Sequence, residues 1–135
     1  MKLMKKRNGF TLIELLAVIV VLAIILVIAV PKVLETINNA KLGAVQSSAK
    51  LIASQAETQY LVNQTTGKAN PETITCAELV GASEDFDLTA AGCTVSINTT
   101  TGVATVSKLT GAGRFTGYSC SSATKSAATC TEPSN

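Results

Sequence analysis

The sequence contains no histidine and no tryptophan in its 135 residues, and aromatic residues make up only 4% of it. Without histidine, a Ser–His or Cys–His nucleophile pair is excluded. The absence of both histidine and a C-x-x-C pair disfavours zinc. There is no Walker loop, and the glycines at 111, 113 and 117 do not have G-x-G-x-x-G spacing, so they are better explained as turn residues. We therefore expect no enzymatic activity and no cofactor.

Charged residues are also scarce, at 15%, and they are unevenly distributed. The 21 residues from Phe10 to Val30 carry one ionisable side chain, Glu14. An apolar stretch of this length can cross a bilayer core of about 30 Å as a helix, whereas few helices of soluble proteins are apolar all round. Four of the 11 basic residues precede it and favour a cytoplasmic N-terminus: Lys2, Lys5, Lys6 and Arg7. We expect a single-pass segment with the rest of the chain exported.

All four cysteines lie beyond the apolar stretch, on the side that we expect to be exported. An even number of cysteines in an oxidising compartment predicts disulfides, and four cysteines allow three pairings. Pairs that are near in sequence close the smaller loops. This favours Cys76–Cys93 and Cys120–Cys130 without excluding the other two pairings.

The polar-to-apolar boundary reads Lys5-Lys6-Arg7-Asn8-Gly9-Phe10-Thr11-Leu12-Ile13-Glu14. An ordinary secretory signal has a shorter apolar region, followed by a small-residue cleavage site. This boundary instead resembles the leader of type IV pilins and pseudopilins, a short basic segment that ends in Gly before Phe-Thr-Leu-Ile-Glu. The resemblance covers about the first third of the chain. It implies that a membrane-embedded prepilin peptidase cuts between Gly9 and Phe10 and methylates the new amine of Phe10.

Leader removal would change the charge of the protein. Residues 1–9 contain four basic side chains and no acidic one, so the net charge would fall from +2 to −2. The basic precursor therefore gives no argument for nucleic-acid binding, and nucleic acid as a partner is left open.

Glu14 is the residue that the membrane segment tolerates least, because a carboxylate at the centre of a bilayer costs about 2.5–3.5 kcal/mol. Cleavage would create a protonated amine at Phe10, one helical turn away. Glu14 could pair with the amine of its own chain, or with the amine of a neighbouring subunit, as the family resemblance implies. A third interpretation is that the carboxylate reaches the membrane interface.

Apolar residues continue at helical spacing from Val33 to Tyr60, which predicts one helix from about Phe10 to about Val62. Pro31 should kink it, because proline removes a backbone donor and crowds the preceding turn. Related pilins are thought to melt near this position on assembly, which makes melting at Pro31 a further hypothesis. We divide the chain into a leader (1–9), a transmembrane and polymerisation half-helix (10–31), an amphipathic half-helix (32–64) and a head (65–135).

In the head, a helical turn is expected near residues 76–80 and a turn at 98–102. Strands are expected at 94–97, 103–109 and 115–120, followed by an exposed loop rich in Ser, Thr and Ala. The predicted fold class is α+β and pilin-like, with one long N-terminal helix packed on a small antiparallel sheet. Residues 85–89 begin like a calcium loop but lack its Gly and Glu, which leaves Glu84, Asp85 and Asp87 as weak candidate ligands.

The leading functional hypothesis is the major subunit of a type IV pilus that serves adhesion, twitching motility or DNA uptake. Its partners would be identical subunits in a helical filament, prepilin peptidase, the membrane before assembly and the pilus assembly machinery. It would move from the cell membrane to an extracellular filament. The alternatives are a pseudopilin of a secretion or competence system and a single-span protein with an exported binding head that never polymerises.

Overall fold

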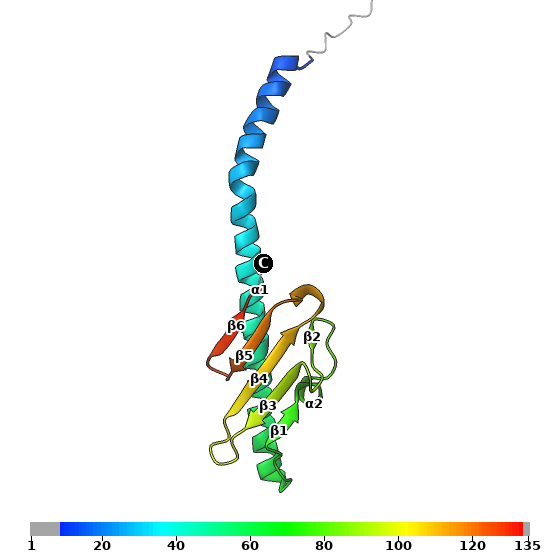
Figure 1. Ribbon diagram of the computed structural model, residues 1–135, viewed down its shortest axis with the longest axis vertical. Coiled ribbons are helices and arrows are strands. Elements are labelled where there is room, and N and C mark those ends of the chain that lie inside the picture. Colours follow the sequence, from blue (N-terminus) through cyan, green and yellow to red (C-terminus); the bar gives the residue numbers. More distant parts are fainter. Residues whose placement is uncertain (1–8, 134–135) are drawn as a thin grey trace, which may run out of the picture. The chain divides into compact units, whose positions relative to one another are not determined.

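The computed structural model describes residues 9–133, and the basic residues of the predicted leader lie outside this range. Helix α1 (Leu12–Thr66) is followed by a small head of strands and short helices (Figure 1). The chain divides into two compact units between Ile37 and Asn38, inside α1, and each unit is described by itself.

The first unit contains the N-terminal half of α1. Every large apolar side chain from Phe10 to Ile37 is at least 44% exposed, so this helix presents apolar side chains all around its axis. Among the described residues, α1 is the one helix long and apolar enough to cross a membrane. A helix of this kind needs an apolar environment that the chain itself does not provide.

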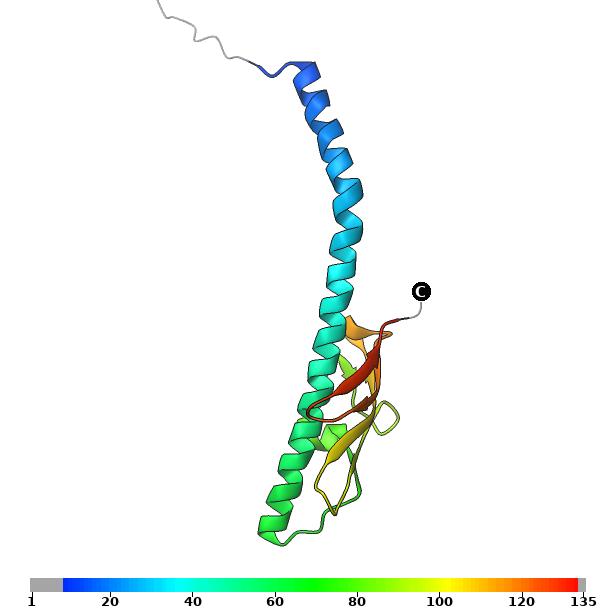
Figure 2. The ribbon, with the colours of Figure 1, turned by 90° about the vertical axis from the view of Figure 1, so that its left-hand side faces the viewer.

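In the second unit, α1 is amphipathic. One stripe of the helix, spaced by three, four or one residues, is buried against the sheet: Val45, Ala49, Ile52, Ala53, Ala56, Tyr60 and Asn63. Three of the seven side chains are alanine, so the helix backbone can lie close to the strands. Figure 2 shows this part of α1 running along one face of the sheet.

The head contains one antiparallel sheet of six strands in the order β1-β3-β4-β5-β6, with β2 paired to β4. The architecture is therefore the predicted α+β, pilin-like one. The bounds of the elements are β1 (Thr73–Thr75), α2 (Cys76–Val80), β2 (Phe86–Asp87), β3 (Cys93–Ile97), β4 (Ala104–Gly111), the 3₁₀ helix η1 (Gly113–Phe115), β5 (Ser119–Ala123) and β6 (Ala128–Thr131).

Strands β3 and β4 form the centre of the core, because alternate side chains point towards α1. Val95 and Val106 are fully buried and face each other across the two strands. Leu109 is the largest of the fully buried side chains. The outward-facing positions between them are mostly Thr and Ser, which gives the sheet one apolar and one polar face.

Two disulfides connect neighbouring elements of the head. Cys76, the first residue of α2, is joined to Cys93 at the start of β3, so the prediction of this disulfide is confirmed. Cys120 of β5 is joined to Cys130, its cross-strand partner in β6. The predicted helical turn at 76–80 and the turn at 98–102 are also present, as α2 and the β3–β4 connection.

The prediction of a strand at 115–120 was wrong at its beginning. Phe115 ends η1, and β5 starts only at Ser119. Gly113 and Gly117 adopt positive φ angles of 48° and 89°, which turn the chain sharply, and the ring of Phe115 stacks on Phe86 with centroids 5.3 Å apart. The predicted C-terminal loop was also wrong in part, because residues 128–131 form β6 and complete a hairpin with β5.

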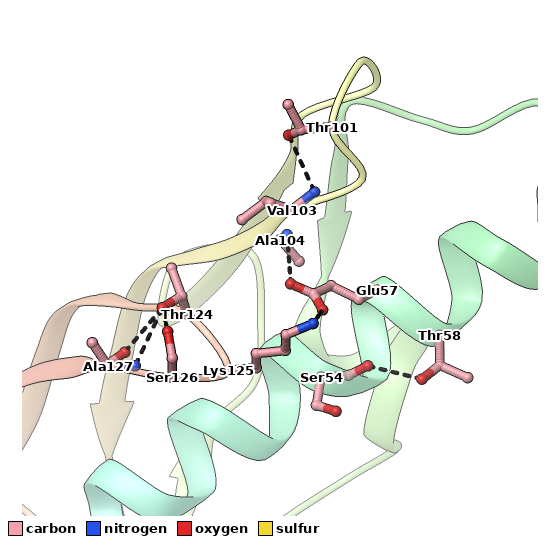
Figure 3. Close-up of polar contacts among 10 residues, drawn as sticks. All are labelled: Ser54, Glu57, Thr58, Thr101, Val103, Ala104, Thr124, Lys125, Ser126 and Ala127. Carbon is pink, nitrogen blue, oxygen red and sulfur yellow. Dashed lines mark hydrogen bonds and ion pairs between the residues drawn. The ribbon is translucent and has the colours of Figure 1, made fainter.

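The tip of the β5–β6 hairpin is tied to α1 by polar contacts. Lys125 Nζ lies 2.8 Å from Glu57 Oε2, and the backbone N–H of Ala104 donates to Glu57 Oε1 at 3.4 Å (Figure 3). One helix turn further on, the hydroxyl of Tyr60 donates to the carbonyl of Thr99 at 2.7 Å. These contacts hold both the hairpin tip and the β3–β4 connection against the helix.

Candidate functional site

The peptide bond between Gly9 and Phe10 lies before α1, outside the helix. Gly9 is exposed, and a Cβ atom added to it would meet no other atom within 4 Å. The side chain of Phe10 is 93% exposed. Within the first unit, the bond at which the sequence predicts leader cleavage is thus accessible to an enzyme. Such access is a general requirement of limited proteolysis.

Thr11 and Glu14 form a capping box at the start of α1. The backbone N–H and the hydroxyl of Thr11 both donate to Glu14 Oε2, each at 2.8 Å. In return, the backbone N–H of Glu14 donates to Thr11 Oγ1 at 3.3 Å. These reciprocal contacts satisfy donors that a helix N-terminus otherwise leaves without partners. They define where α1 begins.

The Glu14 carboxylate therefore has a partner that sequence reasoning missed. The signal was readable, because Thr-x-x-Glu before an apolar stretch is a helix-start pattern. In the precursor the nitrogen of Phe10 is an amide, so neither pairing of Glu14 with a terminal amine is tested by this structure. The roles of Phe10 in N-methylation and of Phe10 and Glu14 in subunit assembly remain predictions.

Pro31 lies inside α1, which is assigned as helix without interruption from Leu12 to Thr66. A proline inside a helix leaves the carbonyl one turn earlier without its N–H donor, so this turn has fewer backbone hydrogen bonds than its neighbours. Melting of the helix at Pro31 on assembly remains a prediction.

The candidate calcium ligands have protein partners instead. Both carboxylate oxygens of Asp85 are bonded to the Arg114 guanidinium, with Nε donating to Oδ1 at 3.0 Å and Nη2 donating to Oδ2. Asp87 Oδ1 accepts the hydroxyl of Thr89 at 2.6 Å and its N–H at 3.1 Å. These hydrogen bonds stabilise the ionised form and hold the pKa of each aspartate below its ordinary value.

Glu84, the third candidate, does not complete a metal site with these two residues. Within residues 9–133, no three or more His, Cys, Asp or Glu side chains come together in a way that could hold a metal ion. The acidic segment before and within β2 is thus organised by Arg114 and Thr89.

Residues 4–30 match a family described as the prokaryotic N-terminal methylation motif. No curated protein and no solved structure matches the chain. The match includes Gly9, Phe10 and Glu14 and ends one residue before Pro31, and it implies processing by prepilin peptidase and passage through a membrane assembly machinery. The chain carries a type IV pilin-like leader followed by one long apolar helix, as in type IV pilins and pseudopilins.

Proposed function

We propose that this protein is a structural, non-catalytic subunit of a type IV pilus, and specifically its major pilin. The leader would be removed between Gly9 and Phe10, and the mature chain would leave the membrane to join an extracellular helical filament of identical subunits. The filament would serve adhesion, twitching motility or DNA uptake.

The observation that carries this proposal is the combination of a prepilin-like leader motif with a helix whose apolar side chains from Phe10 to Ile37 are left exposed by the described residues. Such a surface is stable in a bilayer, where lipid chains surround it. Outside the membrane, the same surface would have to be covered by other apolar helices. Side-by-side packing of many copies supplies that cover, so one segment would serve as anchor first and as filament core afterwards.

Glu14 supports the assembly step. Its carboxylate costs free energy in the membrane, and within residues 9–133 its hydrogen bonds come from its own Thr11. After cleavage, a charged amine at Phe10 would be a stronger partner, because it adds the Coulombic attraction of a full positive charge, which is large where water is excluded. We propose that Glu14 exchanges its Thr11 contacts for the Phe10 amine of a neighbouring subunit on entering the filament.

Two features of the head are consistent with a subunit that is exposed at the cell surface. Its two disulfides fit an oxidising compartment, and the outward face of its sheet is rich in Thr and Ser. A pseudopilin would share the leader, Glu14 and the helix, so abundance at the cell surface is the property that separates the two functions.

The first test is the N-terminus and intact mass of the protein in filaments sheared from the native host. We expect a chain that begins at N-methylated Phe10 and is lighter by two hydrogens for each disulfide. Abundant recovery would favour a major pilin, and processed protein confined to the cell envelope would favour a pseudopilin. A chain that still begins at Met1 and stays in the membrane would contradict the proposal and favour a single-span binding protein.

The second test compares Glu14→Ala with Glu78→Ala. Glu78 makes the same contacts at the start of α2, where Oε2 accepts the N–H and the hydroxyl of Thr75 at 2.9 and 2.7 Å. We expect Glu14→Ala to insert into the membrane but to lose filaments, and Glu78→Ala to form filaments. Filaments at normal yield from Glu14→Ala would exclude an assembly role for this carboxylate.

A further inference from the structure

We propose that Thr11 is a positioning residue for leader removal: its capping contacts stop α1 at Leu12 and thereby keep the Gly9–Phe10 peptide bond outside the helix. This inference rests on the proposed cleavage at that bond. In this role Thr11 acts before the peptide bond is cut. It acts through contacts with residues of its own chain and not through contact with the peptidase.

The hydrogen bonds at the start of α1 place Thr11 at the boundary. The carbonyl of Thr11 accepts the first intrahelical hydrogen bond, from the N–H of Leu15 at 3.2 Å. Its hydroxyl accepts the N–H of Glu14, and its own N–H donates to the Glu14 carboxylate. The N–H groups of Thr11, Glu14 and Leu15 thus have partners without any contribution from a carbonyl upstream of Thr11.

Loss of the Thr11 hydroxyl would leave the Glu14 N–H in need of another acceptor. At an apolar membrane boundary water is a poor substitute, and the nearest backbone acceptor in helical geometry is the carbonyl of Phe10, four residues before Glu14. Accepting that bond would make Phe10 the cap residue and place residue 11 in the first turn. The helix would then grow towards the leader, and the Gly9–Phe10 bond would become part of its end.

A helical end hinders cleavage, because a peptidase has to reach the peptide backbone, and helical geometry turns that backbone inward and occupies its polar groups. Gly9 opposes helix growth as well, since glycine is among the poorest helix formers. Gly9 and Thr11 therefore act together, one on each side of Phe10, to keep the bond exposed as the structure shows it.

The head provides a matched control. Thr75 and Glu78 repeat the Thr-x-x-Glu pattern and two of its hydrogen bonds at the start of α2. A Thr75→Val substitution removes a capping hydroxyl of the same kind from the same chain. Any slowing of cleavage that follows from general damage to the protein should appear in this variant too.

The experiment uses the full-length precursor in membrane vesicles with prepilin peptidase, and compares the wild type with Thr11→Val, Thr11→Ser and Thr75→Val. Valine keeps the shape of threonine without its hydroxyl, and serine restores the hydroxyl. We expect Thr11→Val to lower kcat/KM for leader cleavage by about 2- to 30-fold, the range expected for a lost N-cap. Thr11→Ser and Thr75→Val should be cleaved as fast as the wild type.

A second measurement separates positioning from direct contact with the peptidase. The ¹³Cα chemical shifts of residues 9–14 in micelles report where the helix starts, and Thr11→Val should give residue 11 a helical shift, because the helix would begin one residue earlier than at Leu12. Cleavage of Thr11→Val at the wild-type rate would overturn the inference, and so would slower cleavage with the helix still starting at Leu12. In either case the wild type is cleaved, so the proposed function survives. A wild-type precursor that the peptidase never cuts would instead remove the proposed function.

Discussion

The two halves of α1 belong to one continuous helix, but they differ in how their apolar side chains are buried. Every large apolar side chain from Phe10 to Ile37 is at least 44% exposed within the part of the chain that the structure describes. From Asn38 on, the helix buries a narrow stripe against the sheet and exposes mostly polar residues elsewhere. The contrast shows that helix formation and packing are separate requirements. The first half is folded but needs an external apolar environment, whereas the second half has its core within the chain.

The strongest way to sharpen this comparison is to separate the two halves. A chain that begins at Asn38 should be soluble and monomeric, because it keeps the whole buried core and loses the exposed apolar surface. The full precursor should sediment with membranes and require detergent. Ultracentrifugation and size-exclusion chromatography of both proteins test this. A head fragment that also needs detergent would mean that the head has its own membrane-binding surface.

The next largest effect should come from a cavity in the head. Leu109→Ala removes the largest fully buried side chain and should lower the free energy of unfolding by about 2–5 kcal/mol. Leu61→Ala is the matched control, since Leu61 lies on the exposed face of α1 at 60% exposure, and it should change stability by less than about 0.5 kcal/mol. Urea unfolding of the head measures both. Equal losses would show that the exposed face of α1 is also packed in solution.

The two disulfides both lie in the head, so removing them should affect the stability of the head and not that of the apolar half of α1. Replacing Cys76 and Cys93 together by alanine should destabilise the head by about 2–4 kcal/mol, and replacing Cys120 and Cys130 by slightly less, since the second loop is shorter. The helical circular dichroism of the apolar half in micelles should not change. Loss of that signal on reduction would show that the membrane helix depends on the head.

The two halves also differ in how much of their structure the sequence could predict. The apolar segment, the continuing helical period and the positions of the cysteines all followed from local patterns. The predicted helix end near Val62 differs from Thr66 by about one turn, a usual uncertainty at helix ends. Strands β1 and β6 were missed because Thr, Ser and Ala give them little apolar alternation, and their pairing with β3 and β5 is decided by tertiary contacts.

The site was predicted unevenly for a similar reason. Gly9 and Phe10 were predicted from the resemblance to the pilin leader, and Glu14 was singled out by its charge within the apolar segment; the roles of all three stay predictions. The capping role of Thr11 was not predicted, although Thr-x-x-Glu before an apolar stretch is a helix-start pattern. The partners of Asp85 and Asp87 could be predicted only in part. Thr89 is two residues from Asp87, but Arg114 reaches Asp85 through the fold of the sheet.

The smallest effect should be the acid sensitivity of the head. The Arg114 hydrogen bonds hold the pKa of Asp85 below its ordinary value of 3.8, and hydrogen bonds from Thr75 lower the pKa of Glu78 below 4.5. A carboxyl group whose pKa is lower in the folded state stabilises the protein fully above its unfolded pKa. This contribution is lost as the pH falls through the folded pKa.

We therefore expect the urea midpoint of the head to be flat near neutral pH and to fall once the pH drops below about 4.5, the range in which the unfolded carboxyl groups begin to bind protons. Arg114→Gln should reduce this fall, because it removes the main cause of the lowered pKa of Asp85. High salt should weaken the same contribution, since the Arg114 side chain is exposed to solvent. The acid-induced fall in the urea midpoint should then be similar in Arg114→Gln and in the double variant that combines Arg114→Gln with Asp85→Asn. If Arg114→Gln left the acid profile unchanged, the pair would make no net contribution, and the loss would have to come from Glu78 and Asp87, whose partners are the local threonines.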